Sequence, residues 1–485
     1  MASLWTFTLL CGLLTDTLVQ ATLSPPVLLN LGPEVIKEKL TQELQDHGAT
    51  AILQQLPLLR AMKEKPASGI PLLGSLVDTV LSKIIWLKVT SANILQMQVQ
   101  ASAANQELMV NIPLDMVAGF NTPLVKTIVK LQMQTEIQAV IRVETSKEGP
   151  TRHILSNCST SPGSLRLTLL YKLSILVNIL ADKVIELLAP ALPQLVKNEL
   201  CPVIELAFND MYADLLKMVK AVPISLSPDR LEFDLLSPAI KDNAIQFNLV
   251  AKLLDSKGTV NKYFNNSVAS LTIPTLGSTP FSLIVRQDVV NAVVAALVPP
   301  EEIIILLDYV LPELARELKA RIRVINEKAA DQLGPTQIVK IRTQETPKLL
   351  LSQDSATVAQ LIVLEVFATN EALHPFFTLG IEASSEAQFY TKGDLLMLNF
   401  NNLRCNRIQL MNWAIGWFKP EPLTNIITEI LLSTLLPNQN GKLRPGVPVS
   451  IVKDLGFEAA SCSLIKNALV VTPASSQMLD SPLSQ

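Results

Sequence analysis

The stretch LQMQTEIQAVIRV, residues 131–143, alternates apolar and polar side chains along most of its length. Because successive side chains of a strand point to opposite faces, this period of two predicts a long strand with one dry face and one wet face. Strands of that kind are typical of antiparallel sheets that pack one face on a core. The expected dry face consists of Leu131, Met133, Ile137, Ala139 and Ile141.

Weaker alternating runs on both sides of this strand predict further strands, and helical patterns flank them. The additional strands are expected at residues 95–99, 108–112 and 165–169. Before the strands, Ile36, Leu40 and Leu44 recur every four residues, which predicts a helix. After them, a longer apolar stripe predicts a second helical region that holds Leu173, Val177, Leu180, Val184 and Leu187. We expect three prolines to divide this region because proline removes a backbone donor and clashes with the preceding turn. They are Pro190, Pro193 and Pro202.

The second half of the chain repeats the order of helix and strands, which predicts two similar α+β halves. We place a linker at residues 252–277, where a polar run follows extended segments. Beyond it we expect a long helix at 301–333, strands near 361–363 and 396–400, and a helix at 423–436 that ends at Pro437. The predicted organisation is a signal peptide at 1–21, an N-terminal domain at 22–251, the linker, and a C-terminal domain at 278–485.

The composition is unusually apolar for a chain without a membrane-spanning segment. Hydrophobic residues make up 49% of the 485 residues, and the mean hydropathy is +0.34. The apolar run at residues 4–14 is too short for a spanning helix of about 20 residues. It fits a secretory signal peptide that is cleaved after Ala21, although a buried N-terminal helix is the alternative. We therefore expect an extracellular protein whose surplus apolar side chains hold something apolar.

Several classes of function find no support in the sequence. The net charge of −3 gives no general attraction to nucleic acid. Motifs for nucleophilic, metal-dependent or nucleotide-dependent catalysis are absent, so we expect no enzyme activity and no cofactor. The chain has no CxxC pair, and its three histidines are scattered at positions 47, 153 and 374, so we expect no metal site.

The cysteines and the glycosylation sequons of this chain both fit a secreted protein. Cys11 falls in the signal peptide, and the four remaining cysteines allow three pairings. The simplest pairing gives each half one bridge, Cys158 to Cys201 and Cys405 to Cys462. Asn265 begins a good glycosylation sequon in the polar linker, whereas the sequon at Asn157 has an unfavourable cysteine in its middle position.

Three segments together resemble the bactericidal/permeability-increasing protein (BPI) family, in its long PLUNC branch. They are SLRLTLLYKLSILVNILADKVIELLAPALPQLVKNELCPVI at 164–204, IPLDMVAGFNTPLVKTIV at 112–129 and FTLGIEASSEAQFYTKGD at 377–394. The resemblance covers essentially the whole chain after the signal peptide. It implies a boomerang of two similar BPI-type domains, each a twisted antiparallel barrel packed on long helices, joined by a central sheet. It also implies the bridge between Cys158 and Cys201. The bridge between Cys405 and Cys462 rests only on the even number of cysteines that remain after the signal peptide.

The resemblance further implies an apolar pocket in each domain that takes the acyl chains of phospholipid or lipopolysaccharide. Lining candidates are Leu40, Leu44, Leu173, Val177 and Leu180, although ordinary core packing is the commoner role for any one of them. Bactericidal members bind lipopolysaccharide phosphates with a basic N-terminal tip. In this chain the early basic residues are interleaved with acidic ones; they are Lys37, Lys39, Arg60, Lys63 and Lys65. A second anion candidate is Arg316, Lys319 and Arg323 on one helix face, for which a solvated surface is the alternative.

These observations predict a secreted lipid-binding protein of mucosal innate immunity. It would bind amphipathic lipids, including bacterial lipopolysaccharide, by burial alone, and modulate the response to them without chemistry. One alternative is a phospholipid transfer protein. The other is an airway-surface surfactant or interaction protein without a lipid-carrier role.

Overall fold

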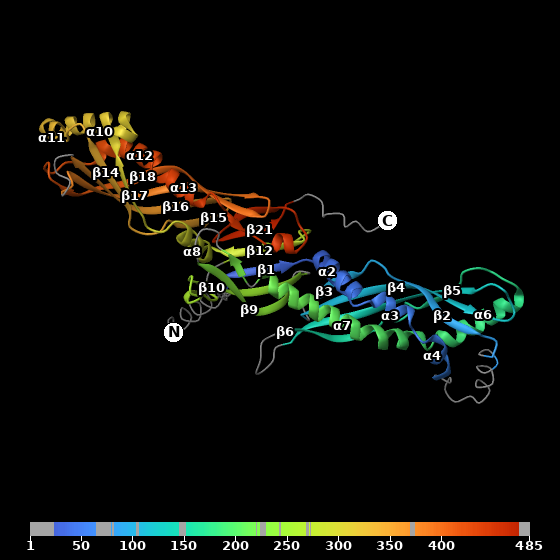
Figure 1. The fold of residues 1–485 in the computed structure, drawn as a ribbon. Helices are drawn as coiled ribbons and strands as arrows, with labels where there is room; N and C mark the ends of the chain where they lie inside the picture. The colour runs from blue at the N-terminus through green and yellow to red at the C-terminus, as the bar shows by residue number, and fades with distance from the viewer. Residues whose placement is uncertain are drawn as a thin grey trace, which may run out of the picture.

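The computed structural model describes residues 24–474 with gaps, and the description below is confined to that part of the chain. The gaps are residues 65–78, 80–81, 103–105, 145–151, 220, 224–228, 242–243, 268–270, 272 and 369–373. The expected signal peptide at 1–21 lies outside the described residues. The molecule is elongated, with one lobe at each end of a central sheet (Figure 1).

An antiparallel sheet with helices along one side forms the N-terminal lobe (Figure 1). Its strands are β2 (Trp86–Ile94), β3 (Gln98–Ser102), β4 (Glu107–Asn121), β5 (Val129–Glu144), β6 (Arg152–Thr160) and β7 (Arg166–Leu169). Its helices are α2 (Pro33–Asp46), α3 (Ala49–Gln54), α4 (Leu58–Glu64), α6 (Ile175–Leu188) and α7 (Leu192–Val219). Strand β5 contains the stretch 131–143, and the five side chains of its predicted dry face are all buried, as expected.

The prolines divide the helical region differently from the prediction. The break falls at residues 189–191, between α6 and α7, and Pro193 lies in the first turn of α7, where its missing N–H costs nothing. Pro202, however, lies inside α7, which continues for 28 residues. The buried face of α7, which includes Ile204, Ala207 and Phe208, holds the helix together across the lost hydrogen bond. Tertiary burial therefore outweighs the local preference at Pro202.

The central sheet takes its strands from distant parts of the chain. Its strands are β1 (Val27–Leu31), β8 (Ala221–Pro223), β9 (Arg230–Lys241), β10 (Ala244–Leu254), β11 (Val260–Phe264), β12 (Phe281–Arg286), β20 (Ala460–Ile465) and β21 (Ala468–Pro473). The first strand, β1, pairs with β10 on one side and β12 on the other, and β12 pairs with β21. All five residues of β1 are buried, so both faces of the sheet are covered at this point. The predicted linker at 252–277 contains β11 and the end of β10, so part of it belongs to this sheet; the domain division itself stays a prediction.

A second long antiparallel sheet forms the C-terminal lobe. Its strands are β13 (Glu302–Leu306), β14 (Gln337–Thr343), β15 (Lys348–Ser352), β16 (Ser355–Ala368), β17 (Phe377–Lys392), β18 (Leu395–Trp413) and β19 (Val447–Pro448). Its helices are α8 (Gln287–Leu297), α9 (Leu307–Val310), α10 (Pro312–Ile325), α11 (Glu327–Gln332), α12 (Thr424–Ser433), α13 (Leu435–Leu443) and α14 (Ile451–Asp454).

Two helix predictions for this lobe were wrong. The expected single helix at 301–333 is a strand, β13, followed by three helices, because the Ile303–Ile305 run pairs with β14 and Pro312 starts a new helix. The helix expected to end at Pro437 instead breaks at Thr434, and Pro437 lies in the first turn of α13. In both places proline marks a helix start. The two-lobed α+β architecture itself is as predicted.

Arg286 ties together three segments that meet at the central sheet. Its side chain is buried, and its Nε and Nη2 atoms donate to the two carboxylate oxygens of Asp288, each at 2.7 Å. Nη1 donates to the carbonyl oxygen of Ser24 at 2.8 Å, and Nη2 also donates to that of Asn265 at 2.9 Å. The guanidinium therefore fixes the start of the described chain, the segment after β11 and the start of α8. None of the helices in the described residues has the length and apolar character needed to cross a membrane.

We expect Arg286→Met to lower the free energy of unfolding by about 1.5–3 kcal/mol, because the buried guanidinium loses its hydrogen bonds to Ser24, Asn265 and Asp288. Urea unfolding followed by fluorescence and circular dichroism measures the change. The matched control is Arg316→Met, because Arg316 is exposed and pairs only with Glu313; its expected cost is about 0.5 kcal/mol or less. Equal stability of the two variants would remove Arg286 from this role.

Candidate functional site

An apolar cavity lies between one face of the central sheet and the adjoining part of the C-terminal lobe. The sheet contributes residues of β1, β9, β10, β12 and β21, and helix α8 covers one side. The hairpin of β17 and β18, β19 and the start of α14 contribute most of the remaining residues, and Met218 comes from the end of α7. The lining residues are Val27, Met218, Leu231, Phe233, Leu249, Leu283, Val285, Val290, Val293, Val294, Leu297, Phe389, Leu396, Leu398, Val447, Pro448, Val449, Ser450, Ile451, Leu469 and Val471.

Strand register explains why these side chains share one face. Val27 lies opposite Leu249 on one side and Val285 on the other, and Val285 lies opposite Leu469. These four residues therefore form a row across four strands. Residues of the next strand position point to the other face, where Leu28, Ile284 and Val470 form a separate small core. The central sheet is thus apolar on both faces, and the cavity occupies one of them.

The cavity suits an alkyl chain rather than a polar ligand. The free space between its walls, together with open solvent at its mouth, is about 950 Å³. Ser450 is the one lining residue with a polar side chain, so little in the wall could orient a charged or hydrogen-bonding group. Leu283 and Val285 remain partly exposed although they lie inside the sheet, because the cavity leaves free space over them. Burial is therefore the interaction that this site can supply.

The residues predicted to line a lipid pocket lie elsewhere. Leu40 and Leu44 are buried on α2, and Val177 and Leu180 are buried on α6, all within the N-terminal lobe. Leu173 is half-buried just before α6, where its backbone exchanges two hydrogen bonds with the side chain of Asn178. None of the five lines the central cavity, and a lipid contact for them stays a prediction.

A different signal in the sequence points to the cavity. The segments of β1, β12 and β21 are short and nearly continuously apolar: VLLNL, FSLIV and ALVV. Such runs are typical of strands that are covered on both faces, unlike the alternating strands of the lobes. They lie far apart in the sequence, so only the fold shows that they are neighbours.

The structure has a disulfide between Cys158 of β6 and Cys201 of α7, with the Cα atoms 5.9 Å apart. It has no bridge between Cys405 and Cys462, which are free thiols, and this second expected pairing was wrong here. Cys462 lies two residues from Ala460, whose N–H donates to the carbonyl of Gly393 beside the start of β18. Cys405 lies ten residues beyond that start, roughly 30 Å along the strand. A disulfide needs the two Cα atoms within about 7 Å of each other, so Cys405 and Cys462 are too far apart to pair.

The remaining predicted sites lie at the surface. Arg316 pairs with Glu313 at 2.7 Å, Arg323 pairs with Asp331 at 3.1 Å, and Lys319 donates to the carbonyl of Gly334 at 3.4 Å. Each cation of the proposed anion patch thus already has a local partner, as on a solvated helix face. Asn157 is exposed in β6 and Asn265 is exposed just after β11. Their glycosylation stays a prediction.

A second functional feature is an apolar surface at the outer end of the N-terminal lobe, which we term the distal tip. It combines the start of β2, the β4–β5 connection and the start of α6, and Figure 1 places these elements at the end remote from the central sheet. Hydrogen bonds join Ile85 to Asn121 and Leu170 to Lys130, so the three segments are neighbours. Its exposed large apolar residues are Ile85, Leu124, Ile128, Tyr171, Ile175, Leu176 and Ile179.

Within the described segments that form the distal tip, the charged residues are basic. Residues 82–94, 116–135 and 164–181 contain six basic residues and no acidic residue; the basic ones are Lys83, Lys88, Lys126, Lys130, Arg166 and Lys172. The first acidic residue of α6 is Asp182, about two turns beyond Ile175. These basic residues differ from the early ones at positions 37–65, and they come from three segments that are far apart in the sequence. Contiguous exposed apolar surface with basic neighbours is typical of contact with lipid surfaces.

Comparisons with known proteins agree with this architecture. The N-terminal domain model of the LBP / BPI / CETP family matches residues 43–213, and the C-terminal domain model matches residues 333–473. BPI fold-containing family B member 1 of Homo sapiens is 70% identical over 485 residues, which is 100% of both chains. The Mus musculus protein of the same name is 60% identical over 476 residues, which is 98% of this chain and 100% of that protein.

A solved structure extends the comparison of the fold. The crystal structure of lipopolysaccharide binding protein covers 93% of this chain and 98% of its own, with a TM-score of 0.51 and 13% sequence identity. The identity is low, so this likeness concerns the fold alone. The family resemblance and the two-domain α+β fold expected from residues 112–129, 164–204 and 377–394 are confirmed.

We expect alkylation of the denatured, non-reduced protein to modify Cys405 and Cys462 and to spare Cys158 and Cys201, as read by peptide mapping. In the native protein, burial raises the pKa of the Cys405 and Cys462 thiols. Because only the thiolate reacts, native labelling should be slow at neutral pH and should accelerate as the pH rises beyond the ordinary thiol range. A peptide pair that joins Cys405 to Cys462 would contradict the free-thiol assignment.

Proposed function

Because this chain belongs to the LBP / BPI / CETP family, we propose that it binds amphipathic lipids by enclosing their acyl chains in the central cavity. The observation that carries the proposal is the apolar lining of that cavity, in which Ser450 is the one polar side chain. A lipid would leave its headgroup at the mouth, where water and surface residues solvate it. No reactive group takes part.

Burial alone provides enough free energy for such binding. Each methylene group that leaves water contributes about 0.8 kcal/mol, so a 16-carbon chain gains on the order of 10 kcal/mol before the costs of ordering. Aliphatic walls do not distinguish one chain from another except by length and bulk. We therefore expect a broad preference for saturated or lightly unsaturated chains rather than one specific lipid.

The wider role that fits this binding is a secreted protein of mucosal innate immunity that takes up bacterial lipopolysaccharide and modulates the response to it. A signal-peptide-like start, two sequons and the Cys158–Cys201 disulfide support secretion. Lipopolysaccharide combines acyl chains with a phosphorylated headgroup, and the apolar lining of the central cavity suits the acyl chains. The basic residues of the distal tip supply charges of the matching sign.

Leu283→Trp is expected to reduce the uptake of a fluorescent fatty acid or phospholipid at least tenfold, because the larger side chain fills the free space over β12. The matched control is Leu350→Trp, since Leu350 is exposed on β15 and does not line the cavity. Titration of delipidated protein with the labelled lipid measures both. Unchanged uptake in a folded Leu283→Trp protein would show that lipid binds elsewhere or not at all.

A second candidate function is attachment to a lipid–water interface through the distal tip, either for surface activity or for lipid transfer between particles. Ile175 is 78% exposed and Leu176 is 69% exposed on the first turn of α6, far more than a folded soluble surface requires. Lys88 lies 5.2 Å from the ring centre of Trp86, so an aromatic ring and a cation sit together at the same end. Aromatic and basic residues favour the headgroup region of membranes.

The double substitution Ile175→Asn with Leu176→Asn is expected to weaken binding to anionic phospholipid vesicles at least tenfold, because each buried aliphatic side chain contributes about 1.5–3 kcal/mol. Val324→Asn on α10 is the control, since Val324 is equally exposed in the other lobe. Vesicle flotation measures binding at low and high salt. Binding that is insensitive to the tip variant excludes interfacial attachment there, and rapid vesicle-to-vesicle transfer by the wild type would favour a transfer protein over a retaining one.

A further inference from the structure

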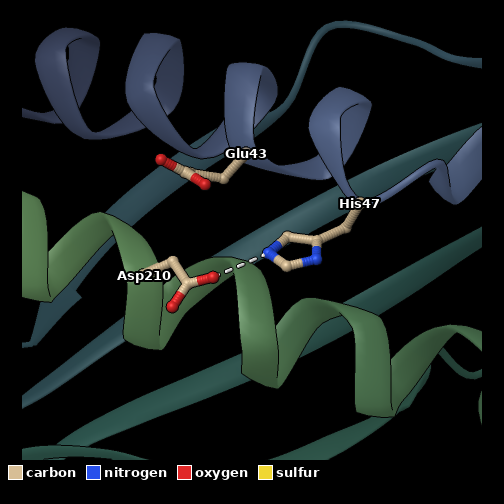
Figure 2. A group of neighbouring side chains, drawn as sticks. All are labelled: Glu43, His47 and Asp210. Atoms are coloured by element: carbon tan, nitrogen blue, oxygen red, sulfur yellow. Dashed lines mark hydrogen bonds and ion pairs between the residues drawn. The ribbon is translucent and has the colours of Figure 1, made fainter.

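Two helices of the N-terminal lobe bring three metal-ligating side chains together (Figure 2). Glu43 lies in the last turn of α2 and His47 is the residue that caps the C-terminal end of this helix, and both point toward Asp210 on α7. The Nε2 atom of His47 lies 3.0 Å from Oδ2 of Asp210. One ligand atom from each of the three residues lies within 4.8 Å of the others.

Negative charge accumulates around this trio. The carboxylates of Asp214, Asp210 and Asp46 lie near the carboxylate of Glu43. Lys217 is the basic residue close to this group, and its ammonium already pairs with Asp214 at 2.8 Å. A cation between α2 and α7 would lower the repulsion among these carboxylates, because it would bring positive charge next to Glu43 and Asp210.

The donor set and its spacing suit a transition-metal ion. An imidazole with two carboxylates matches the ligands of zinc and its neighbours better than those of calcium or magnesium, which prefer oxygen alone. With metal–ligand distances of about 2.0–2.2 Å, the donor atoms of a tetrahedral site lie roughly 3.4 Å apart. The present separations are 4.8 Å or less, so the donor atoms need to approach one another by about 1.4 Å at most. A water molecule would complete the coordination.

We propose that Glu43, His47 and Asp210 bind a divalent transition-metal ion, such as Zn²⁺, that clamps α2 to α7. The inner sides of both helices are already packed: Leu40 and Leu44 on α2 and Met211 on α7 are buried. The metal would therefore add a polar clamp on the outer side of an existing helix pair. The proposed metal site is independent of lipid binding and differs from the sequence-based expectation of no metal site. The sequence hides the trio because Asp210 lies 163 residues from His47.

Isothermal titration of the EDTA-treated full chain with Zn²⁺ tests the site. We expect one saturable site in the wild type and at least tenfold weaker binding in His47→Ala, Asp210→Asn and Glu43→Gln, since even outer-shell changes cost about 10–100-fold. His374→Ala is the matched control, because His374 is an exposed histidine of the other lobe. It should bind Zn²⁺ as the wild type does.

Thermal unfolding provides the second readout and checks that the variants fold. Zn²⁺ should raise the Tm of the wild type and of His374→Ala, and should leave the Tm of the three site variants unchanged. In EDTA, Glu43→Gln should be at least as stable as the wild type, because it removes one of the crowded carboxylates. A wild type that shows no saturable Zn²⁺ binding would overturn the proposal. So would site variants that fold and still bind Zn²⁺ with the affinity of the wild type.

Discussion

The structure depends on the pairing of β1 with two strands that come from much later in the chain. Val27–Leu31 lies between β10 and β12, and through β12 it joins β21 near the C-terminal end. All five residues are buried, so every backbone group of this strand must find its partner within the sheet. The buried guanidinium of Arg286 secures the same region from the side. Both lobes are built outward from this shared sheet.

That constraint also produces the candidate binding site. A sheet that is apolar on both faces needs cover on both, and the segment around Leu271 and Ile273 covers one face closely. On the other face, α8 and the β17–β18 hairpin leave the apolar cavity. The distal tip lies at the opposite end of the N-terminal lobe, so a surface for meeting lipid aggregates and a cavity for holding acyl chains are separate parts of one molecule (Figure 1).

Local sequence patterns predicted the strands of the lobes well, but they predicted the contacts between distant segments poorly. The alternation in 131–143 identified β5 and its buried face, because a strand with one wet face records its environment in its own sequence. The apolar run at Ile303–Ile305 looked helical, since periodicity cannot separate a short strand from a helix without knowledge of its partner β14. The cavity, the distal tip and the trio at His47 each combine segments that are distant in sequence. Only long-range pairing brings these segments together. The even number of cysteines likewise carried no information about the distance between Cys405 and Cys462.

The central claim is that acyl chains occupy the cavity between the central sheet and the C-terminal lobe. Photocrosslinking with a phospholipid that carries a diazirine on its acyl chain, followed by peptide mapping of the full chain, tests this claim most directly. We expect crosslinks on the peptides of α8 and of the β17–β18 hairpin, and we expect an excess of unlabelled lipid to suppress these crosslinks. Crosslinks confined to α2 and α6, or none that unlabelled lipid suppresses, would contradict it.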